Sequence, residues 1–200
     1  MTGNEIIHTA LATVVQATKA KQESWIVGGS VGLMLRGLPL AAKPRDLDIY
    51  CDLEDVQNIY DSLKLYAIDE PAISVTSMYR SCLCHFIIDD VQVELVGGFQ
   101  VSALGCRYVT AVRKLLLPYG ARIQIRKDLD VCIVPLAHEL CFNMLRGRSD
   151  RVQLIAAAIA ANPSLHEGAL QAIELSSHFT DEAKKELHGL ITAGEEGGML

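Results

Sequence analysis

The stretch Trp25-Ile-Val-Gly-Gly-Ser30 decides how this chain folds, together with Arg45-Asp-Leu-Asp-Ile-Tyr50 a short way further on. The first is a short apolar run that ends in glycines, which predicts a strand entering a tight turn. Ser30 is placed to cap a helix that runs to about Leu38. The second stretch is an apolar strand with two aspartates on alternate residues. This order of strand, turn, helix and strand predicts a mixed α/β core.

The rest of the chain divides into a part with strands and a part without them. Within residues 1–134 helical patterns alternate with short apolar runs, and Asp89-Asp90 between two such runs predicts a β-hairpin. From Leu136 to Thr192 the spacing of apolar residues is helical. We therefore expect an α+β fold, in which residues 1–134 form a mixed sheet flanked by helices and residues 135–200 form a helical subdomain packed on that core.

Composition and charge limit the class of protein. The 200 residues are 50% hydrophobic and 21% charged, as in globular chains. No apolar run is long enough to span a bilayer and the N-terminus lacks the pattern of a signal peptide, so we expect a cytoplasmic protein with no membrane partner. The formal net charge of -6 argues against broad DNA binding, although a local basic cluster could still bind a nucleotide or a tRNA end.

The cysteines resemble core thiols more than metal ligands. Most of the six lie inside apolar segments, as reduced cysteines of a cytosolic protein do. Only Cys82-Leu-Cys84-His85 has the composition of a metal cluster, and it has no second ligand pair at zinc spacing. Strand alternation also puts both cysteines on one face. Buried thiols are therefore favoured over a zinc site.

Strand alternation also gathers carboxylates on one face of the second stretch. Residues two apart share a face of a strand, so Asp46, Asp48 and Tyr50 face outward together while Leu47 and Ile49 enter the core. Two carboxylates so close repel each other unless a cation lies between them. A strand with a solvated polar face is the alternative, and it is the commoner explanation of Asp-x-Asp on its own.

The second strand of the predicted hairpin supplies a third carboxylate. In Val91-Gln-Val-Glu-Leu95, Glu94 shares a face with Gln92, away from the apolar side chains. If this strand pairs beside the strand of Asp46, Glu94 completes three carboxylates on one surface. Hard oxygen ligands in that number suit Mg²⁺. An exposed strand glutamate is the alternative.

The turn at Gly28-Gly29-Ser30 complements the carboxylates. At the start of a helix it would offer free backbone amides, the positive end of the helix dipole and a hydroxyl, all suited to phosphate. A tight turn with a capping serine explains these three residues equally well when they are taken alone. Phosphate-binding amides beside cation-binding carboxylates are what metal-dependent phosphoryl or nucleotidyl transfer requires.

The order of these motifs resembles the DNA-polymerase-β-type nucleotidyltransferase superfamily. Its pattern is a Gly-Gly/Ser turn that opens a helix, an Asp-x-Asp on the next strand and a third acidic residue on a further strand. Val27-Gly-Gly-Ser30, Asp46-Leu-Asp48 and Glu94 match that pattern. Lys43 resembles a basic residue found three positions before the first aspartate in many bacterial members. Residues 134–150 resemble the helix, Gly-Arg turn and acidic residue of the AbiEii-like and related uncharacterised branch.

The resemblance implies that the chain moves a nucleoside monophosphate from a nucleoside triphosphate to a hydroxyl acceptor and releases pyrophosphate. Asp46, Asp48 and Glu94 would be the catalytic residues and would ligate two Mg²⁺ ions, or Mn²⁺ in their place. Glu94 would bind the ion nearest the acceptor and help to remove the acceptor's proton.

The resemblance also implies the residues that bind the nucleotide. Gly28, Gly29 and Ser30 would hold the triphosphate, and Lys43 or Arg45 would neutralise it. Solvated basic residues beside a strand are the alternative for the last two.

On the acceptor side the resemblance points to Arg148 and Asp150, while a helix cap at Ser149 and Asp150 with solvated arginines is the favoured alternative. A small molecule, a protein hydroxyl and a tRNA 3′ end are all acceptors within the superfamily. We expect His138 and Glu139 to be exposed at the start of a helix rather than catalytic.

Two departures from the family pattern keep other functions open. The third carboxylate is Glu94 where aspartate is usual, and Asn143 stands where lysine is frequent. A non-catalytic member that binds a nucleotide or a partner is therefore the main alternative. A small metal-dependent phosphohydrolase is a third, although the extra histidine and aspartate ligands of such enzymes are missing from the sequence.

Overall fold

The computed structural model of the chain describes residues 3–21 and 23–197, which form two compact units. The first, here called the sheet unit, comprises residues 1–75, 80–99 and 110–134. The second, the helical unit, comprises residues 76–79, 100–109 and 135–200. The helical unit thus combines a hairpin from the middle of the chain with the helices at its end.

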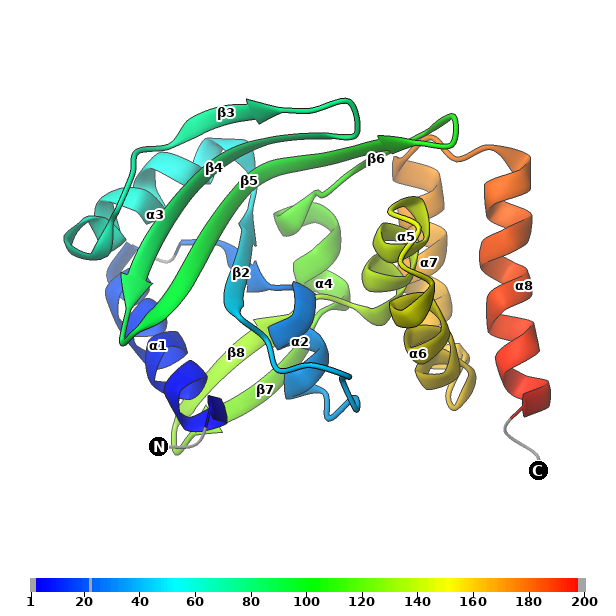
Figure 1. The fold of residues 1–200 in the computed structure, drawn as a ribbon, viewed down its shortest axis with the longest axis horizontal. Coiled ribbons are helices and arrows are strands. Elements are labelled where there is room, and N and C mark those ends of the chain that lie inside the picture. The colour runs from blue at the N-terminus through cyan, green and yellow to red at the C-terminus, as the bar shows by residue number, and fades with distance from the viewer. Residues whose placement is uncertain (1–2, 22, 198–200) are drawn as a thin grey trace. The chain divides into compact units, whose positions relative to one another are not determined.

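Within the described residues, helices and strands are interspersed as far as residue 133, and the named elements after it are helices (Figure 1). The elements of the first part are α1 (Gly3–Thr18), η1 (Lys19–Lys21), β1 (Trp25–Val27), α2 (Gly29–Leu35), β2 (Asp46–Cys51), η2 (Leu53–Asp55), α3 (Val56–Leu63), η3 (Lys64–Tyr66), β3 (Ala72–Val75), β4 (Tyr79–Ile88), β5 (Val91–Ala103), β6 (Cys106–Val109), the π-helix η4 (Val112–Leu116), α4 (Leu117–Tyr119), β7 (Ala121–Arg126) and β8 (Leu129–Ile133). Those of the second part are α5 (Leu136–Leu145), α6 (Ser149–Ala160), α7 (Ser164–Ser176) and α8 (Asp181–Gly197). The predicted α+β class is confirmed.

Strand β2 occupies the middle of a mixed sheet. Among the described residues the strand order is β3-β4-β5-β2-β1-β8-β7, and β6 pairs with β5 off this path. Strand β2 is antiparallel to β1, with Val27 opposite Ile49, and parallel to β5, with Asp48 opposite Glu94. A parallel pair needs a long crossover connection, which α3, β3 and β4 provide here.

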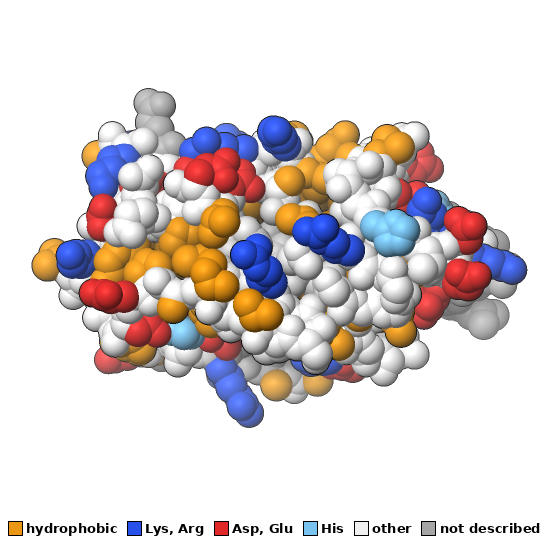
Figure 2. Space-filling view, turned by 90° about the horizontal axis from the view of Figure 1, so that it is seen from above, with side chains coloured by type: hydrophobic (Ala, Val, Ile, Leu, Met, Phe, Trp, Pro, Cys, Tyr) orange, Lys and Arg blue, Asp and Glu red, His pale blue; other side chains and the backbone are white. Residues whose placement is uncertain are grey.

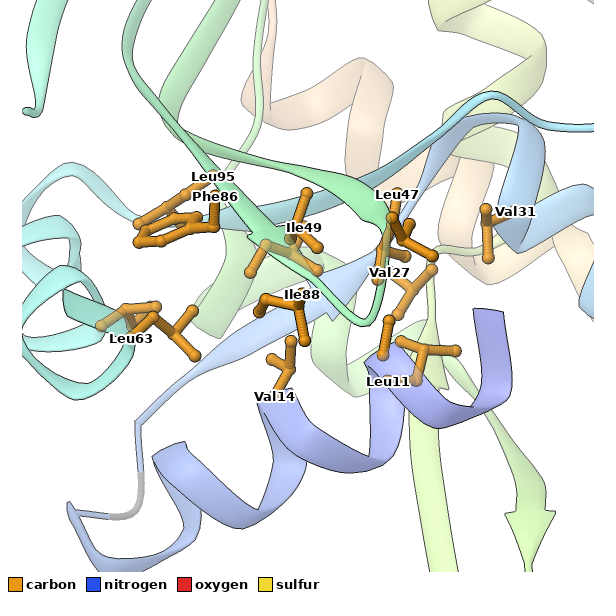
Figure 3. Close-up of a cluster of buried hydrophobic side chains, with 14 of the residues drawn as sticks. Leu11, Val14, Val27, Val31, Leu47, Ile49, Leu63, Phe86, Ile88 and Leu95 are labelled. Carbon is orange, nitrogen blue, oxygen red and sulfur yellow. The ribbon is translucent and has the colours of Figure 1, made fainter. Parts of the chain in front are cut away.

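One face of the sheet is buried under α1 and α3. Figure 3 shows side chains from α1 and from the central strands directed into one apolar cluster. The labelled members with no exposed surface are Leu11, Val14, Val27, Val31, Leu47, Ile49, Leu63, Phe86, Ile88 and Leu95. The prediction that Leu47 and Ile49 enter the core is confirmed, and the opposite face of β2 is left for polar side chains.

The hairpin between β4 and β5 forms at the predicted place, but β5 is longer than expected. Asp89 and Asp90 have φ of 51° and 64°, as a two-residue hairpin turn requires. The apolar run of the sequence ends at Val96, before Gly97-Gly98, yet β5 continues through these glycines to Ala103. A Cβ on Gly97 would lie 2.0 Å from Cγ2 of Val56. The glycine therefore allows β5 to pass close to α3 rather than ending the strand.

Five of the six cysteines are buried and all six are free, as predicted for core thiols. Burial raises the pKa of Cys84 to about 12, which disfavours the thiolate that zinc requires. Cys82 and Cys84 point into the core from β4, and His85 follows on the opposite face of the strand. The three side chains therefore do not converge.

The end strand β3 carries exposed apolar side chains. Ile73 and Val75 keep 54% and 66% of their surface exposed. Figure 2 shows hydrophobic side chains gathered over the part of the surface where β3 lies.

No helix within the described residues has the length and apolar character needed to cross a membrane.

Helix α5 of the helical unit is buried along its whole length. His138 and Glu139 are 0% and 2% exposed, so the expectation that they are exposed is wrong. The reason is that α6 and α7 both pack against α5, so that no side of it is left to solvent. Two polar contacts form inside: His138 Nδ1 lies 2.5 Å from the Tyr108 hydroxyl, and Asn143 donates to the Glu139 carboxylate at 3.0 Å.

This burial of His138 predicts a specific acid sensitivity. Burial lowers the pKa of His138 from 6.5 to about 3. Between these values the unfolded chain binds a proton that the folded chain does not, so the free energy of unfolding should fall as the pH falls through this window. One such residue contributes up to about 1.4 kcal/mol per pH unit. Urea unfolding of the wild type and of His138→Gln at several pH values in this window measures the effect. Equal pH slopes for both proteins would contradict it.

Candidate functional site

The turn between β1 and α2 lies directly against β2. The backbone N–H of Gly28 donates to the carbonyl oxygen of Asp48 at 3.0 Å. Gly29 has φ of 60°, and a Cβ there would lie 2.1 Å from Oδ2 of Asp48. The start of α2 is therefore in contact with the outward face of β2 at Asp48.

Helix α2 begins two residues earlier than the sequence predicts. Its first residue is Gly29 and its N-cap is Gly28, with no side-chain cap hydrogen bond, so the prediction that Ser30 caps the helix is wrong. The left-handed backbone of Gly29 makes the turn, and this leaves Ser30 inside the first turn of the helix. Ser30 is half-buried.

The face of β2 that carries the aspartates is only partly open. Tyr50 shares this face but is only 3% exposed. The expectation that it faces solvent together with the aspartates is therefore wrong. A Cβ on Gly28 would lie 2.2 Å from Cε2 of the Tyr50 ring, and the Phe99 ring centroid lies 6.0 Å from that of Tyr50. The glycine turn and Phe99 thus cover the end of this face beyond Asp48.

The three predicted carboxylates lie on one face of two adjacent strands. The parallel register sets Asp46 opposite Gln92 and Asp48 opposite Glu94. Paired residues of neighbouring strands point to the same side of a sheet, and Asp46, Asp48 and Glu94 are all half-buried. Within residues 3–21 and 23–197, no three His, Cys, Asp or Glu side chains are grouped closely enough to hold a metal ion. The strands bring the carboxylates to one surface without converging them on one point.

Glu94 has two polar neighbours that the sequence did not indicate as part of the site. Its Oε1 accepts a hydrogen bond from Gln92 Nε2 at 3.1 Å and lies 3.9 Å from His85 Nε2. His85 Nδ1 is in turn 2.5 Å from Oδ2 of Asp69. The sequence does contain a signal for this contact. In a hairpin with a two-residue turn at Asp89-Asp90, the residue opposite Glu94 is His85.

The basic residues predicted for the nucleotide lie just before β2. Lys43 and Arg45 are both exposed, in the irregular segment that leads into Asp46. Their long side chains have freedom to reach a bound anion from this position. Their role in binding stays a prediction.

The residues predicted for the acceptor belong to the helical unit. Arg148 Nε lies 3.4 Å from Oδ1 of Asp150, and Arg151 Nε lies 3.8 Å from Oδ2. The hydrogen bond from Arg148 lowers the pKa of Asp150. The N-cap of α6 is Arg148 with no side-chain cap hydrogen bond, so the alternative in which Ser149 and Asp150 cap this helix is wrong.

The donor types at this face suit a divalent cation with a phosphate ligand, although the carboxylates do not converge on one point. Carboxylate oxygens are the donors that Mg²⁺ prefers, and Mg²⁺ usually keeps room for water and for phosphate oxygens. The space that a Cβ of Gly29 would take lies beside the Asp48 carboxylate. A helix start there can bring a phosphate next to Asp48. Asp46, Asp48 and Glu94 are the residues that would hold the ion.

Comparison with known proteins identifies the fold. No family model and no curated protein sequence matches the chain. A crystal structure from Thermotoga maritima, provisionally described as a nucleotidyltransferase, is 22% identical over 76% of this chain and 90% of its own, with a TM-score of 0.62. The solution structure of the antibiotic-resistance factor ANT(2'')-Ia is 11% identical over 94% and 98%, with a TM-score of 0.53. The chain therefore has the fold of these two structures.

The packing of Gly28 on Tyr50 leads to a stability prediction. Gly28→Ala should lower the free energy of unfolding by about 1–3 kcal/mol, because the added Cβ overlaps a buried ring. Gly189→Ala in α8, where a Cβ meets nothing within 4 Å, is the control and should be neutral or slightly stabilising. In a Tyr50→Leu background the Gly28→Ala penalty should shrink. An unchanged penalty in that background, measured by urea unfolding, would contradict the contact.

Proposed function

We propose that the chain is a Mg²⁺-dependent nucleotidyltransferase that moves a nucleoside monophosphate from a nucleoside triphosphate to a hydroxyl acceptor. The observation that carries the proposal is the pairing of Asp48 with Glu94 on parallel strands, with the Gly29 backbone against the Asp48 carboxylate. A phosphate-binding turn beside paired carboxylates supports this chemistry in a chain that has the fold of nucleotidyltransferase structures.

Each group in the site has a role in this reaction. Asp46, Asp48 and Glu94 would hold the cations, two Mg²⁺ or Mn²⁺, which would supply charge stabilisation for the transfer. The Gly29 backbone and the Ser30 hydroxyl orient the triphosphate at the start of α2. The N–H of Gly28 donates to the Asp48 carbonyl oxygen, so Gly28 contributes by holding the turn against β2. The partial burial of the carboxylates strengthens their interaction with a cation relative to bulk water.

The remaining assignments complete the proposal. Lys43 and Arg45 neutralise the triphosphate from the exposed segment before β2, and Arg148 with Asp150 contributes to acceptor binding. We place the chain with the AbiEii-like branch of cytoplasmic nucleotidyltransferases on the motif at residues 134–150. One structure with the same fold is an antibiotic-resistance factor, so small hydroxyl-bearing molecules are the first acceptors to test, before protein hydroxyls and tRNA ends.

The transfer reaction can be measured without knowing the acceptor. The purified chain is incubated with Mg²⁺, each α-³²P-labelled nucleoside triphosphate in turn, and a whole-cell extract, and the label is followed into products other than free nucleotides. Label should appear with the wild type and be lost on removal of Mg²⁺ with EDTA. Asp48→Asn should abolish transfer and weaken metal binding while the fold is kept, because it removes one ligand charge. Asp130→Asn, an exposed aspartate of strand β8, is the matched control.

Two results would count against this mechanism. Unaltered transfer by Asp48→Asn would show that the carboxylate site takes no part in the reaction. Triphosphate binding without transfer to any extract fraction would favour the alternative, a non-catalytic nucleotide-binding or partner-binding member of the fold.

The contact between Gly29 and Asp48 gives a second test of the same site. Gly29→Ala should weaken Mg²⁺ binding at least about tenfold, because the new Cβ displaces the Asp48 carboxylate from the turn. Gly37→Ala is the matched control, since Gly37 also has positive φ but a Cβ there meets nothing within 4 Å. Both variants should lose about 1 kcal/mol of unfolding free energy from the left-handed backbone. Equal Mg²⁺ affinities in calorimetric titrations of the two variants would contradict the role of the turn.

A further inference from the structure

Asp69 is fixed to strand β4 by several contacts. Ala67 forms a β-bridge with Phe86, and the N–H of Ile68 donates to the carbonyl oxygen of His85 at 3.0 Å. One oxygen of Asp69 accepts the backbone N–H of His85 at 2.6 Å, and the other lies 2.5 Å from His85 Nδ1. The bend before β3 therefore holds the Asp69 carboxylate in one place relative to the imidazole.

The charge state of Asp69 strengthens this arrangement. Burial raises the pKa of Asp69, but the hydrogen bonds from the His85 side chain and backbone outweigh burial and lower the pKa overall. With its Nδ1 edge fixed, the ring presents Nε2 to the neighbouring strand.

The group that His85 faces is Glu94. Its Nε2 lies 3.9 Å from Glu94 Oε1, which also accepts the Gln92 side-chain N–H at 3.1 Å. The side chains of His85 and Glu94 are 24% and 25% exposed, so both are largely enclosed. His85 and Gln92 both approach Oε1 of Glu94. The other oxygen, Oε2, is therefore the one that can bind another ligand.

Glu94 needs this restraint more than an aspartate would. A glutamate has one more rotatable bond, and fixing it on a ligand costs more conformational entropy. The register puts Glu94 directly opposite Asp48, where its carboxylate has to be held to share a cation. Groups that orient a ligating carboxylate contribute to metal affinity although they do not touch the metal.

From these contacts we infer that Asp69, His85 and Gln92 form a positioning frame that orients Glu94 as the third ligand of the cation. His85 is the central member, because it connects the anchored Asp69 carboxylate to Glu94. It is a positioning residue and does not contact the nucleotide. The inference rests on the proposed function, since it concerns the same cation site.

Mn²⁺ binding tests the frame without any acceptor or turnover. The affinity of the full chain for Mn²⁺ is measured by electron paramagnetic resonance titration. His85→Ala should weaken it about tenfold or more, in the range known for residues that orient metal ligands. His85→Gln, whose amide can take the place of Nε2, should recover most of the affinity, whereas His85→Asn, which reaches only Asp69, should not. His188→Ala removes a similar histidine pair, at 2.9 Å from Glu174 in the helical unit, and should leave the affinity unchanged.

A double-mutant cycle separates orientation of Glu94 from a general loss of structure. Glu94→Asp shortens the side chain and withdraws it from the imidazole, so adding His85→Ala to that variant should change the affinity less than about twofold. Equal effects of His85→Ala in both backgrounds, or full affinity in His85→Ala, would overturn the frame while the cation site stands. A wild-type chain that binds no Mn²⁺ would overturn the proposed function and the frame with it.

Discussion

The close contact between the Gly28-Gly29 turn and strand β2 is the constraint on which the site depends. A backbone hydrogen bond joins Gly28 to Asp48, and the missing side chains of the two glycines make room for Tyr50 and for the Asp48 carboxylate. Any Cβ at these positions would separate the helix start from the strand. The contact therefore fixes the distance between the two parts that a phosphate-metal site needs, the amides and the carboxylates.

Strand β2 connects this turn to the rest of the sheet unit. Its inward residues Leu47 and Ile49 belong to the core that packs against α1, and this packing fixes the position of the strand. On its other face the parallel register with β5 sets Glu94 beside Asp48. Rigid strands on a packed core position side chains more accurately than loops do. The longer reach of Glu94 is offset by Gln92 and by His85.

Much of this could be read from the sequence, because strand alternation and two-residue turns follow local rules. The inward Leu47 and Ile49 and the hairpin at Asp89-Asp90 are of this kind. Two of the failed predictions concern residues whose burial is decided by distant packing. Tyr50 is buried because the glycine turn and Phe99 cover it, and His138 is buried because α5 is enclosed by its neighbouring helices. The contact of Asp69 with His85 joins a bend to a strand, and no periodic pattern in the sequence predicts such a contact.

The most direct test of the account is a crystal structure of the chain with Mn²⁺ and a non-hydrolysable nucleoside triphosphate, in which anomalous scattering locates the metal. The account predicts a metal peak about 2.1 Å from oxygens of Asp46, Asp48 and Glu94. It also predicts triphosphate oxygens within hydrogen-bond distance of the backbone at the start of α2. A metal peak away from these carboxylates, or a triphosphate bound elsewhere on the chain, would contradict it.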